Sequence, residues 1–230
     1  RKVRYTQDPE RWAGSYIDSL IALASSYKGD LTADAIMLGQ EALSICKARY
    51  TQDPEREAKY SDSLNTLANI YDTAGRTTDV IALHEEALGL YKARYTQDPE
   101  RWAKNYSVSL NNLAASYNKV GRRTDAVAFH KQALVICKVH YAQDAERWAE
   151  SYTDSLIYLA NIYDIIGRTE DSITLQQEAL GIRKTRYSLD PERWAADYTT
   201  SLSNLATSYN AVGRTTDAIT LHEEALAIRK

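Results

Sequence analysis

Three of the four histidines could take part in metal binding, because histidine is a common metal ligand and these three share one position of an internal repeat. They are His84, His130 and His222. Neighbouring repeats would bring His84 and His130 near each other, but no acidic or thiol side chain accompanies them at ligand spacing. Gly39 and Gln176 take their place in the other repeats. We therefore expect these side chains to pack against the next helix, and we predict no metal site and no cofactor.

An aspartate and a glutamate two residues apart recur in every connector, and paired carboxylates can do general acid–base work. The pairs are Asp8/Glu10, Asp53/Glu55, Asp98/Glu100, Asp144/Glu146 and Asp190/Glu192. A catalytic site is normally singular, whereas a pair repeated at each helix start is better explained by helix capping and by the helix dipole. No nucleophile elbow or phosphate-binding loop accompanies the pairs. The sequence therefore predicts a protein that is not an enzyme.

Basic residues could form ridges for nucleic acid along one edge. They are Lys47/Arg49, Lys92/Arg94, Lys138/His140 and Arg183/Lys184/Arg186, with Arg76, Arg122, Arg168 and Arg214 at the turns. The acidic connectors lie directly beside them, and the formal net charge of −3 provides no attraction for nucleic acid or for an anionic membrane. No apolar run approaches the roughly 20 residues of a membrane helix. We predict neither nucleic-acid nor membrane binding, and a charge-balanced, solvated edge.

Cys46 and Cys137 occupy the same position two repeats apart. Stacked repeats lie roughly 10 Å apart, so this pair is beyond the reach of a disulfide. We expect two small hydrophobic side chains in a reducing compartment, which predicts a cytoplasmic protein. No signal peptide is present at the opening residues RKVRYTQDPE, and the chain opens and closes at a similar point of the repeat. We therefore expect it to be a piece of a longer array.

The internal repeat is marked by turn glycines 46 residues apart. They are Gly29, Gly75, Gly121, Gly167 and Gly213. Tyrosine follows the same register, since all but Tyr91 and Tyr158 fall on three repeated positions. These tyrosines are interpreted as packing residues. Residues 1–230 thus form one array with repeats at approximately 5–49, 50–94, 95–140, 141–186 and 187–230.

Each repeat is predicted to be two helices joined at the turn glycine. In the third repeat, Asp98 is the expected N-cap and Pro99 suits the first helical position. One face of this first helix carries Trp102, Tyr106, Leu110, Leu113, Ala114 and Tyr117. Gly121 should end it, after about 22 residues.

The second helix of this repeat should begin with Thr124 or Arg123 as N-cap and have Asp125 in its first turn. Its apolar face comprises Val127, Ala133, Leu134, Cys137 and Tyr141 over about 18 residues. No strand pattern competes with the helices. A helix pair of this size cannot bury its own apolar face and must stack on the next pair. The fold class predicted is all-α, a right-handed superhelical solenoid of five helix-turn-helix repeats.

The pattern Leu110-x-x-Leu113-Ala114-x-x-Tyr117-x-x-x-Gly121, followed by Ala126, His130 and Ala133-Leu134, resembles the tetratricopeptide repeat. The variety is similar to the long repeats of kinesin light chains, which also occur as sensor or scaffold arrays in NACHT- and NB-ARC-type ATPases. The resemblance implies a protein-interaction role. Two features depart from the family: the residues at the histidine position are not large and apolar, and the second helix of each repeat is longer.

In this repeat family the first helix of each repeat lines a concave groove. The matching positions lie one, two, five and eight residues after the first leucine of the apolar face. The residues proposed there for binding are Asn65, Asn69, Asp72, Asn111, Asn112, Asn118, Tyr158, Asn161, Asp164, Asn204 and Asn210; Ile157 and Ser203 also match, as do Ile21, Ala22, Ser25 and Lys28 in the first repeat. No cluster of lysine and arginine lies among them, so a clamp for a C-terminal carboxylate is not supported.

Asparagine is a poor residue within a helix, because its side chain competes for backbone hydrogen bonds. Its recurrence on one face has two explanations. Each amide can donate and accept at once, so a row of amides could hold an extended peptide, with Tyr158 as a stacking anchor. Alternatively, the amides bond within the stack or face water. The sequence leaves both open.

Two functions follow from this pattern. The first is a non-catalytic scaffold that binds a protein or peptide ligand in the concave groove. The second is a structural spacer that stacks end to end through its terminal repeats, because near-identical repeats present near-identical end faces and a contact of this kind does not close.

Overall fold

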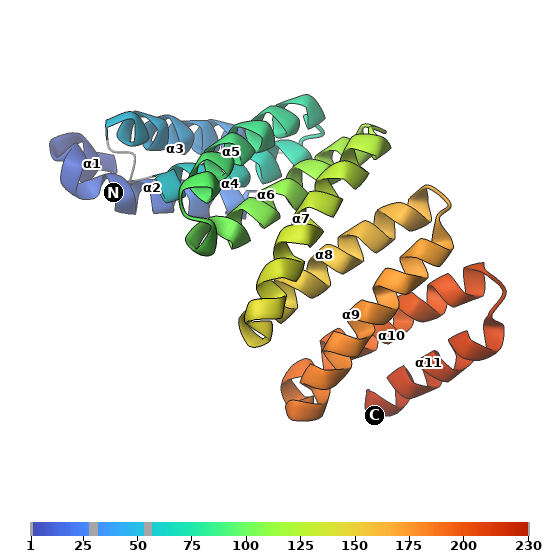
Figure 1. Cartoon of the computed structure of the whole chain (residues 1–230). Coiled ribbons are helices and arrows are strands. Elements are labelled where there is room, and N and C mark those ends of the chain that lie inside the picture. The colour runs from blue at the N-terminus through green and yellow to red at the C-terminus, as the bar shows by residue number, and fades with distance from the viewer. Residues whose placement is uncertain (1, 28–31, 53–56, 230) are drawn as a thin grey trace. The chain divides into compact units, whose positions relative to one another are not determined.

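The computed structural model describes residues 2–27, 32–52 and 57–229, and within these ranges the elements are eleven helices and no strand (Figure 1). The contacts divide the chain into two compact units, residues 1–102 and 103–230, which are described separately. The all-helical class predicted from the sequence is confirmed. No described helix has the length and the apolar character that crossing a membrane requires.

The first unit consists of helices that pack in chain order, α2 on α3, α3 on α4 and α4 on α5. The short α1 packs on α2. The helices are α1 (Lys2–Gln7), α2 (Pro9–Ser26), α3 (Thr32–Gln52), α4 (Glu57–Thr73) and α5 (Thr77–Gln97). The hairpins α2/α3 and α4/α5 therefore stack through α3 and α4, as the repeat predicted.

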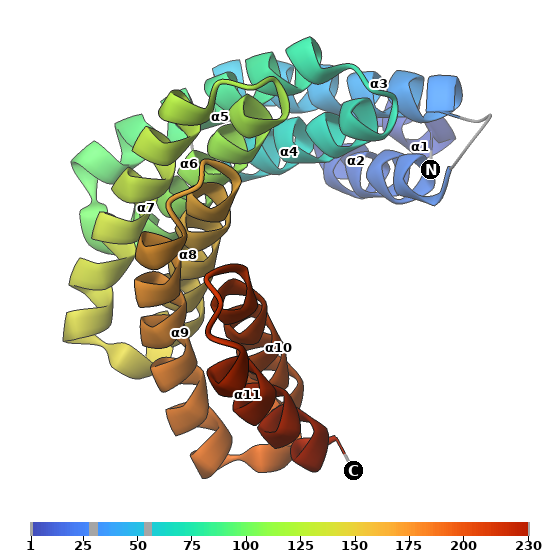
Figure 2. The ribbon, with the colours of Figure 1, turned by 90° about the vertical axis from the view of Figure 1, so that its right-hand side faces the viewer.

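The second unit continues the same order from Ala103 within α6, with α7 on α8, α8 on α9, α9 on α10 and α10 on α11 (Figure 2). The rings of Tyr117 and Phe129, 5.6 Å apart, join α6 to α7. The helices are α6 (Pro99–Lys119), α7 (Arg123–Gln143), α8 (Ala145–Ile165), α9 (Thr169–Leu189), α10 (Pro191–Ala211) and α11 (Thr215–Ile228). A second helix of one repeat thus lies between its own first helix and the first helix of the next.

The connector aspartates cap the first helices, as predicted. Each accepts a hydrogen bond on Oδ1 from the backbone N–H three residues later: Asp8 from Arg11 at 3.2 Å, Asp98 from Arg101 at 3.1 Å, Asp144 from Arg147 at 3.0 Å and Asp190 from Arg193 at 3.1 Å. This bond satisfies one of the free amides at a helix start. Asp53 and Glu55 lie outside the described residues.

The second helices begin differently from the prediction. The N-cap of α7 is Arg122, not Thr124 or Arg123, and its side chain makes no capping bond. Instead the Arg122 Nε donates to Asp125 Oδ2 at 2.6 Å, and the guanidinium lies 4.0 Å from the Tyr117 ring centre. The same arrangement recurs at Arg76, Arg168 and Arg214. The second helices α5, α7, α9 and α11 therefore start where an arginine is held between a ring and a carboxylate. Helix α7 has 21 residues rather than about 18.

One tyrosine in a first helix joins three helices. In α8, the Tyr152 ring stacks on Tyr141 at the end of α7, 4.9 Å between centres, and its hydroxyl donates to Glu178 on α9. Tyr198 repeats this with Tyr187 at 5.1 Å and Glu224 at 2.6 Å. In the first unit the same contacts join Tyr60 to Tyr50 and Glu86, and Tyr16 to Tyr5 and Glu41. Burial, and then the Glu41 hydrogen bond, raise the pKa of Tyr16 to about 12, so this hydroxyl stays a donor.

The two cysteines are buried and free, as expected from their spacing. Cys46 lies 3.0 Å from the Ser63 hydroxyl on α4, and Cys137 accepts from Ser155 on α8 at 3.4 Å. Burial raises the pKa of both thiols. They contact the next repeat as small polar side chains.

The turn between the two helices of a repeat needs a residue with left-handed backbone, and glycine provides it. Gly75, Gly121, Gly167 and Gly213 have φ between 69° and 79°, while Gly29 lies outside the described residues. At Gly167 the N–H donates to the Asp164 carbonyl at 3.1 Å, and Arg168 donates to Tyr163 at 2.8 Å. This closes the C-terminus of α8.

We expect Gly167→Ala and Gly181→Ala to change stability in opposite directions. Gly181 lies inside α9, and an added Cβ would meet nothing within 4 Å. Alanine there should raise the free energy of unfolding by about 0.5–1 kcal/mol, because glycine is a poor helix former. Alanine at Gly167, with its positive φ, should lower it by about 1 kcal/mol. Urea denaturation followed by circular dichroism measures both, and equal shifts would contradict this account of the turn.

Candidate functional site

The residues proposed for binding fall into three environments. Asn69, Asn161 and Asn210 are exposed, and Asn112 and Asn204 are half-buried on the first helices. Asn65 is half-buried, and its Oδ1 is buried with no hydrogen-bond partner among the described residues. Lys28, at a matching position of the first repeat, lies outside the described residues. The other members, Asp72, Asn111, Asn118 and Asp164, form hydrogen bonds within the helical stack, and Tyr158 makes a ring contact there.

Asn111 bonds within the stack. It is buried, its Oδ1 lies 2.8 Å from His130 Nδ1 on α7, and its Nδ2 donates to the Ser155 hydroxyl on α8 at 3.4 Å. One amide thereby joins three helices. For this residue the structure favours the second of the two explanations that the sequence left open.

The residues eight positions after the leucine lie at the turn. The backbone carbonyls of Asp72, Asn118, Asp164 and Asn210 each accept from the N–H of the turn glycine, at 3.0 or 3.1 Å. The Asp164 side chain also accepts from Ser172 at 2.8 Å, from Gln176 at 3.3 Å and from Ser208 at 3.3 Å. Its carboxylate therefore links α8 to α9 and α10.

Asn111, Asn112 and Tyr158 come together at a cavity of about 120 Å³ between α6 and α8. The remaining lining residues are Lys104, Ser107, Val108, Glu150, Ser151, Asp154 and Ser155. The Tyr158 ring stacks on the buried His130, 5.9 Å between centres, yet Tyr158 remains 46% exposed. We name this the α6/α8 cavity.

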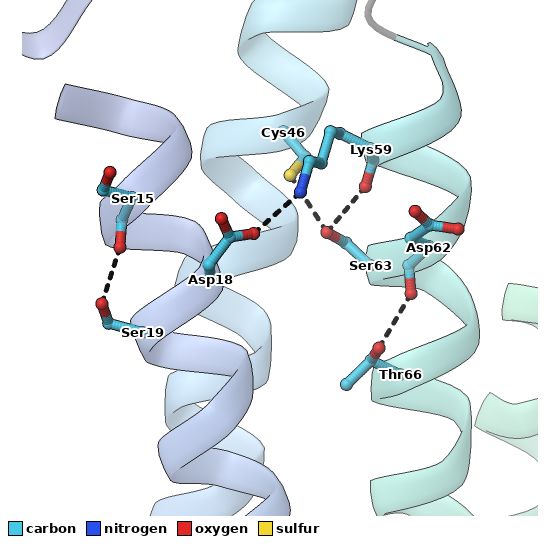
Figure 3. A network of polar contacts seen from close by, with 8 residues as sticks. All are labelled: Ser15, Asp18, Ser19, Cys46, Lys59, Asp62, Ser63 and Thr66. Atoms are coloured by element: carbon cyan, nitrogen blue, oxygen red, sulfur yellow. Dashed lines mark hydrogen bonds and ion pairs between the residues drawn. The ribbon is translucent and has the colours of Figure 1, made fainter. Parts of the chain in front are cut away.

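In the first unit an ion pair crosses the corresponding place between α2 and α4. There Lys59 Nζ lies 2.8 Å from Asp18 Oδ1, and Figure 3 shows this ion pair crossing from α4 to α2 beside Cys46 and Ser63. Lys59 precedes Tyr60 as Ser151 precedes Tyr152, and Asp18 lies two residues before Leu20 as Val108 lies before Leu110. A short serine and a valine thus replace the two side chains of the ion pair. The α6/α8 cavity thus lies beside the positions that this ion pair occupies in the first unit.

The charges around the cavity are mixed. Glu150 and Asp154 lie on α8, and Lys104 lies on α6. Burial raises the pKa of Asp154, although Arg183 on α9, 3.7 Å away, opposes this effect. A carboxylate, two amides, hydroxyls and a ring face suit the side chain of a polar ligand. Among the described residues no group of three or more His, Cys, Asp and Glu side chains could hold a metal ion.

Sequence reasoning missed Lys104, Glu150, Ser151 and Asp154. The available signal was Val108, which stands where Asp18, Asp62 and Asp154 stand in three other repeats. Ser151 gave no such signal, because the first repeat has Ser15 at the same position.

His130 packs against the next first helix, as predicted for the histidine position, through the ring of Tyr158. Burial lowers its pKa from 6.5 to about 4, so it is neutral at pH 7. His84 is also buried, whereas His222 on α11 is exposed.

This burial predicts a pH dependence of stability. Below pH 6.5 the unfolded chain binds a proton at His130 that the folded chain does not bind until about pH 4. The free energy of unfolding should therefore fall between these values by up to about 1.4 kcal/mol per pH unit from this group. His130→Gln, which copies Gln176 of the next repeat, should reduce this slope, and His222→Gln should leave it unchanged. Urea midpoints from pH 7 to 4 give the slopes; identical slopes for both variants would contradict the assignment.

The family model of the tetratricopeptide repeat matches residues 108–150 and 199–230. These matches cover most of α6, all of α7, the start of α8, and most of α10 with α11. In these two stretches the helical pairs match the tetratricopeptide repeat, and the resemblance recognised from the sequence is confirmed.

The solved structures that share this fold include repeat proteins of the kinesin-light-chain type. BtubC (BKLC) from P. vanneervenii is 21% identical, with a TM-score of 0.77 over 99% of this chain and 85% of that chain. A kinesin-light-chain protein of Podosopora anserina with nearly identical TPR-like repeats is 23% identical, with a TM-score of 0.70 over 93% of this chain and 94% of that one. No curated protein sequence matches the chain.

A third solved structure is the Rap conjugation gene regulator of the plasmid pLS20 in complex with the Phr* peptide. It is 17% identical, with a TM-score of 0.57, over 86% of this chain and 48% of the regulator. At these identities the likeness shows the shared fold.

Proposed function

We propose that this protein is a non-catalytic interaction scaffold that holds a partner segment along the first helices of the second unit, with one partner side chain in the α6/α8 cavity. The observation that supports this most is the cavity itself, which lies where the equivalent place between α2 and α4 is crossed by an ion pair. The Rap regulator, a protein of the same fold, was solved with a bound peptide. Repeat scaffolds offer extended surfaces for such partners.

Two side chains provide the contacts. The Asn112 side-chain amide is half-buried, and the described part of the chain offers it no side-chain hydrogen bond, so it can donate to and accept from a peptide. Tyr158 stacks on His130 and is 46% exposed, so part of its ring is open to a ligand. A ring held in this way loses little freedom when a ligand binds it. Asn161 and Asn204 extend the polar surface along α8 and α10.

The double variant Val108→Asp, Ser151→Lys tests the proposal by importing the ion pair of the first unit. Its new side chains should fill the α6/α8 cavity without disturbing the buried contacts below. A random 12-residue peptide library displayed on phage is selected on the wild-type chain and depleted on the double variant. We expect enriched peptides whose affinity falls at least about tenfold in the double variant and in Tyr158→Ala, a loss of roughly 1.4 kcal/mol.

The matched control is Val135→Asp, since Val135 is 62% exposed on α7 and lies outside the cavity lining. It should leave peptide affinity unchanged. The triple variant Asn112→Ala, Asn161→Ala, Asn204→Ala should weaken the same peptides while the circular dichroism spectrum stays that of the wild type. Peptides that bind the double variant as tightly as the wild type would place the interaction elsewhere and reject the cavity.

A further inference from the structure

The α6/α8 cavity has more acidic than basic groups in its lining. Glu150 and Asp154 on α8 carry carboxylates, and Lys104 on α6 carries an ammonium group. Neither Glu150 nor Lys104 forms an ion pair with any residue that the structure describes. The repeat position that these two share holds a small residue in the other repeats: Gly14, Ala58 and Ala196. Two unpaired charged side chains therefore replace small ones at this cavity.

The Asp154 carboxylate also lacks hydrogen bonds. Arg183 Nη2 on α9 lies 3.7 Å from its Oδ1, which is too far for a hydrogen bond. The other guanidinium nitrogen, Nη1, donates to the Asp197 carbonyl at 3.1 Å and to the Ser201 hydroxyl at 2.9 Å. Burial raises the pKa of Asp154, so the surroundings stabilise its charged form less than water does. A second cation beside this carboxylate would stabilise it.

Elsewhere a cation of the chain itself lies between neighbouring first helices. Lys59 of α4 pairs with Asp18 of α2 at 2.8 Å. Arg183 of α9 lies between α8 and α10, where it pairs with one and donates to the other. At the α6/α8 junction, Ser151 and Cys137 hold the repeat positions of Lys59 and Arg183, and both are uncharged. This junction therefore has carboxylates without the cation that those two junctions have.

The uncharged part of the lining suits the stem of a long basic side chain. Val108 on α6 is 45% exposed and Tyr158 on α8 is 46% exposed, so both offer apolar surface to the cavity. The methylene groups of lysine and arginine cover such surface while the charged end stays in polar surroundings. The face of a tyrosine ring also attracts a cation. An acidic or purely apolar ligand side chain would leave both carboxylates without a partner.

We propose that the partner side chain held in the α6/α8 cavity is a lysine or an arginine, which presupposes the peptide-binding function proposed above. Its charged end lies between Glu150 and Asp154 and donates charge-assisted hydrogen bonds to them. Its stem lies between Val108 and Tyr158. Lys104 acts against this ligand, because like charges repel.

The probes that test this assignment are the 12-residue peptides that the phage selection enriches and that lose affinity in the Val108→Asp, Ser151→Lys variant. These cavity-dependent peptides should share one lysine or arginine. Replacing that residue with norleucine keeps an apolar stem and removes the charge, and it should weaken binding at least about tenfold. Fluorescence anisotropy of labelled synthetic peptides gives the dissociation constants.

Variants of the protein should change the affinity for the basic peptide in opposite directions. Asp154→Asn and Glu150→Gln each remove one carboxylate charge and should weaken binding about three- to tenfold, with no change for the norleucine analogue. Lys104→Ala removes the opposing charge and should strengthen binding. Glu150 is exposed and has no ion pair among the described residues, so its variant reports on the ligand even where Asp154→Asn disturbs Arg183.

The matched control is Asp62→Asn. Asp62 holds the repeat position of Asp154 on α4, burial also raises its pKa, and it lies outside the cavity lining. This variant should bind the basic peptide as the wild type does.

The outcomes separate this inference from the scaffold function. Cavity-dependent peptides that share no basic residue, or that bind Glu150→Gln and Asp154→Asn as tightly as the wild type, overturn the cationic ligand and leave the scaffold intact. Peptides that bind the Val108→Asp, Ser151→Lys variant as tightly as the wild type reject both.

Discussion

The contact on which the stack depends most is the tyrosine in the middle of the first helix. Tyr152 meets the end of the preceding second helix with its ring face and its own second helix with its hydroxyl. A stacked aromatic pair is worth about 0.5–1.5 kcal/mol beyond the area it buries, and a hydrogen bond to a charged group about 1.5–3 kcal/mol. Because both contacts use one rigid side chain, the placement of a first helix fixes that of its two neighbours. The glutamate that accepts this bond is exposed or half-buried, whereas the tyrosine of the first helix is buried.

In a repeat protein of this kind, a substitution in one repeat can create a binding site that the other repeats lack. Most positions of the first helices are fixed by packing, as shown by Leu64, Leu110, Leu156 and Leu202, which are all fully buried. The positions that face the neighbouring first helix are not fixed in this way. An ion pair crosses between α2 and α4, whereas Val108 and Ser151 hold the corresponding positions beside the α6/α8 cavity. Function in such a protein is therefore sought where one repeat departs from the others.

The sequence predicts the helices well because their ends are set by local chemistry. An aspartate followed by proline starts a first helix, and a glycine with positive φ ends it, as at Asp98 and Gly121. The start of the second helix was missed because Arg122 is held by Tyr117, five residues earlier, a contact that no capping preference encodes. Its length was underestimated because the helix continues until the next aspartate, Asp144.

The candidate site was less predictable, because neighbouring residues on a helix point about 100° apart. Asn111 and Asn112 are adjacent and chemically identical, yet Asn111 bonds His130 and Ser155 inside the stack while Asn112 lines the cavity. Asp164 likewise turns inward to Ser172 and Ser208. A family position identifies the helix face to within about one residue, and that uncertainty separates a binding residue from a structural one. Only the partner across the interface, here His130 or Gln176, decides between them.

The buried polar side chains specify which repeats pack on one another. Apolar faces alone would not do so, because in near-identical repeats they are so similar that they could pack in several orders. The buried polar sets differ, however: Asn111, His130 and Ser155 meet around α7, whereas Asp164, Gln176 and Ser208 meet around α9. A wrong pairing would leave a buried amide or carboxylate without its partner, which costs about 1–3 kcal/mol for each group. His130 and Gln176 stand where the repeat family has a large apolar residue, so some hydrophobic contact is lost at these positions. Their polar contacts make each junction between repeats different from the next.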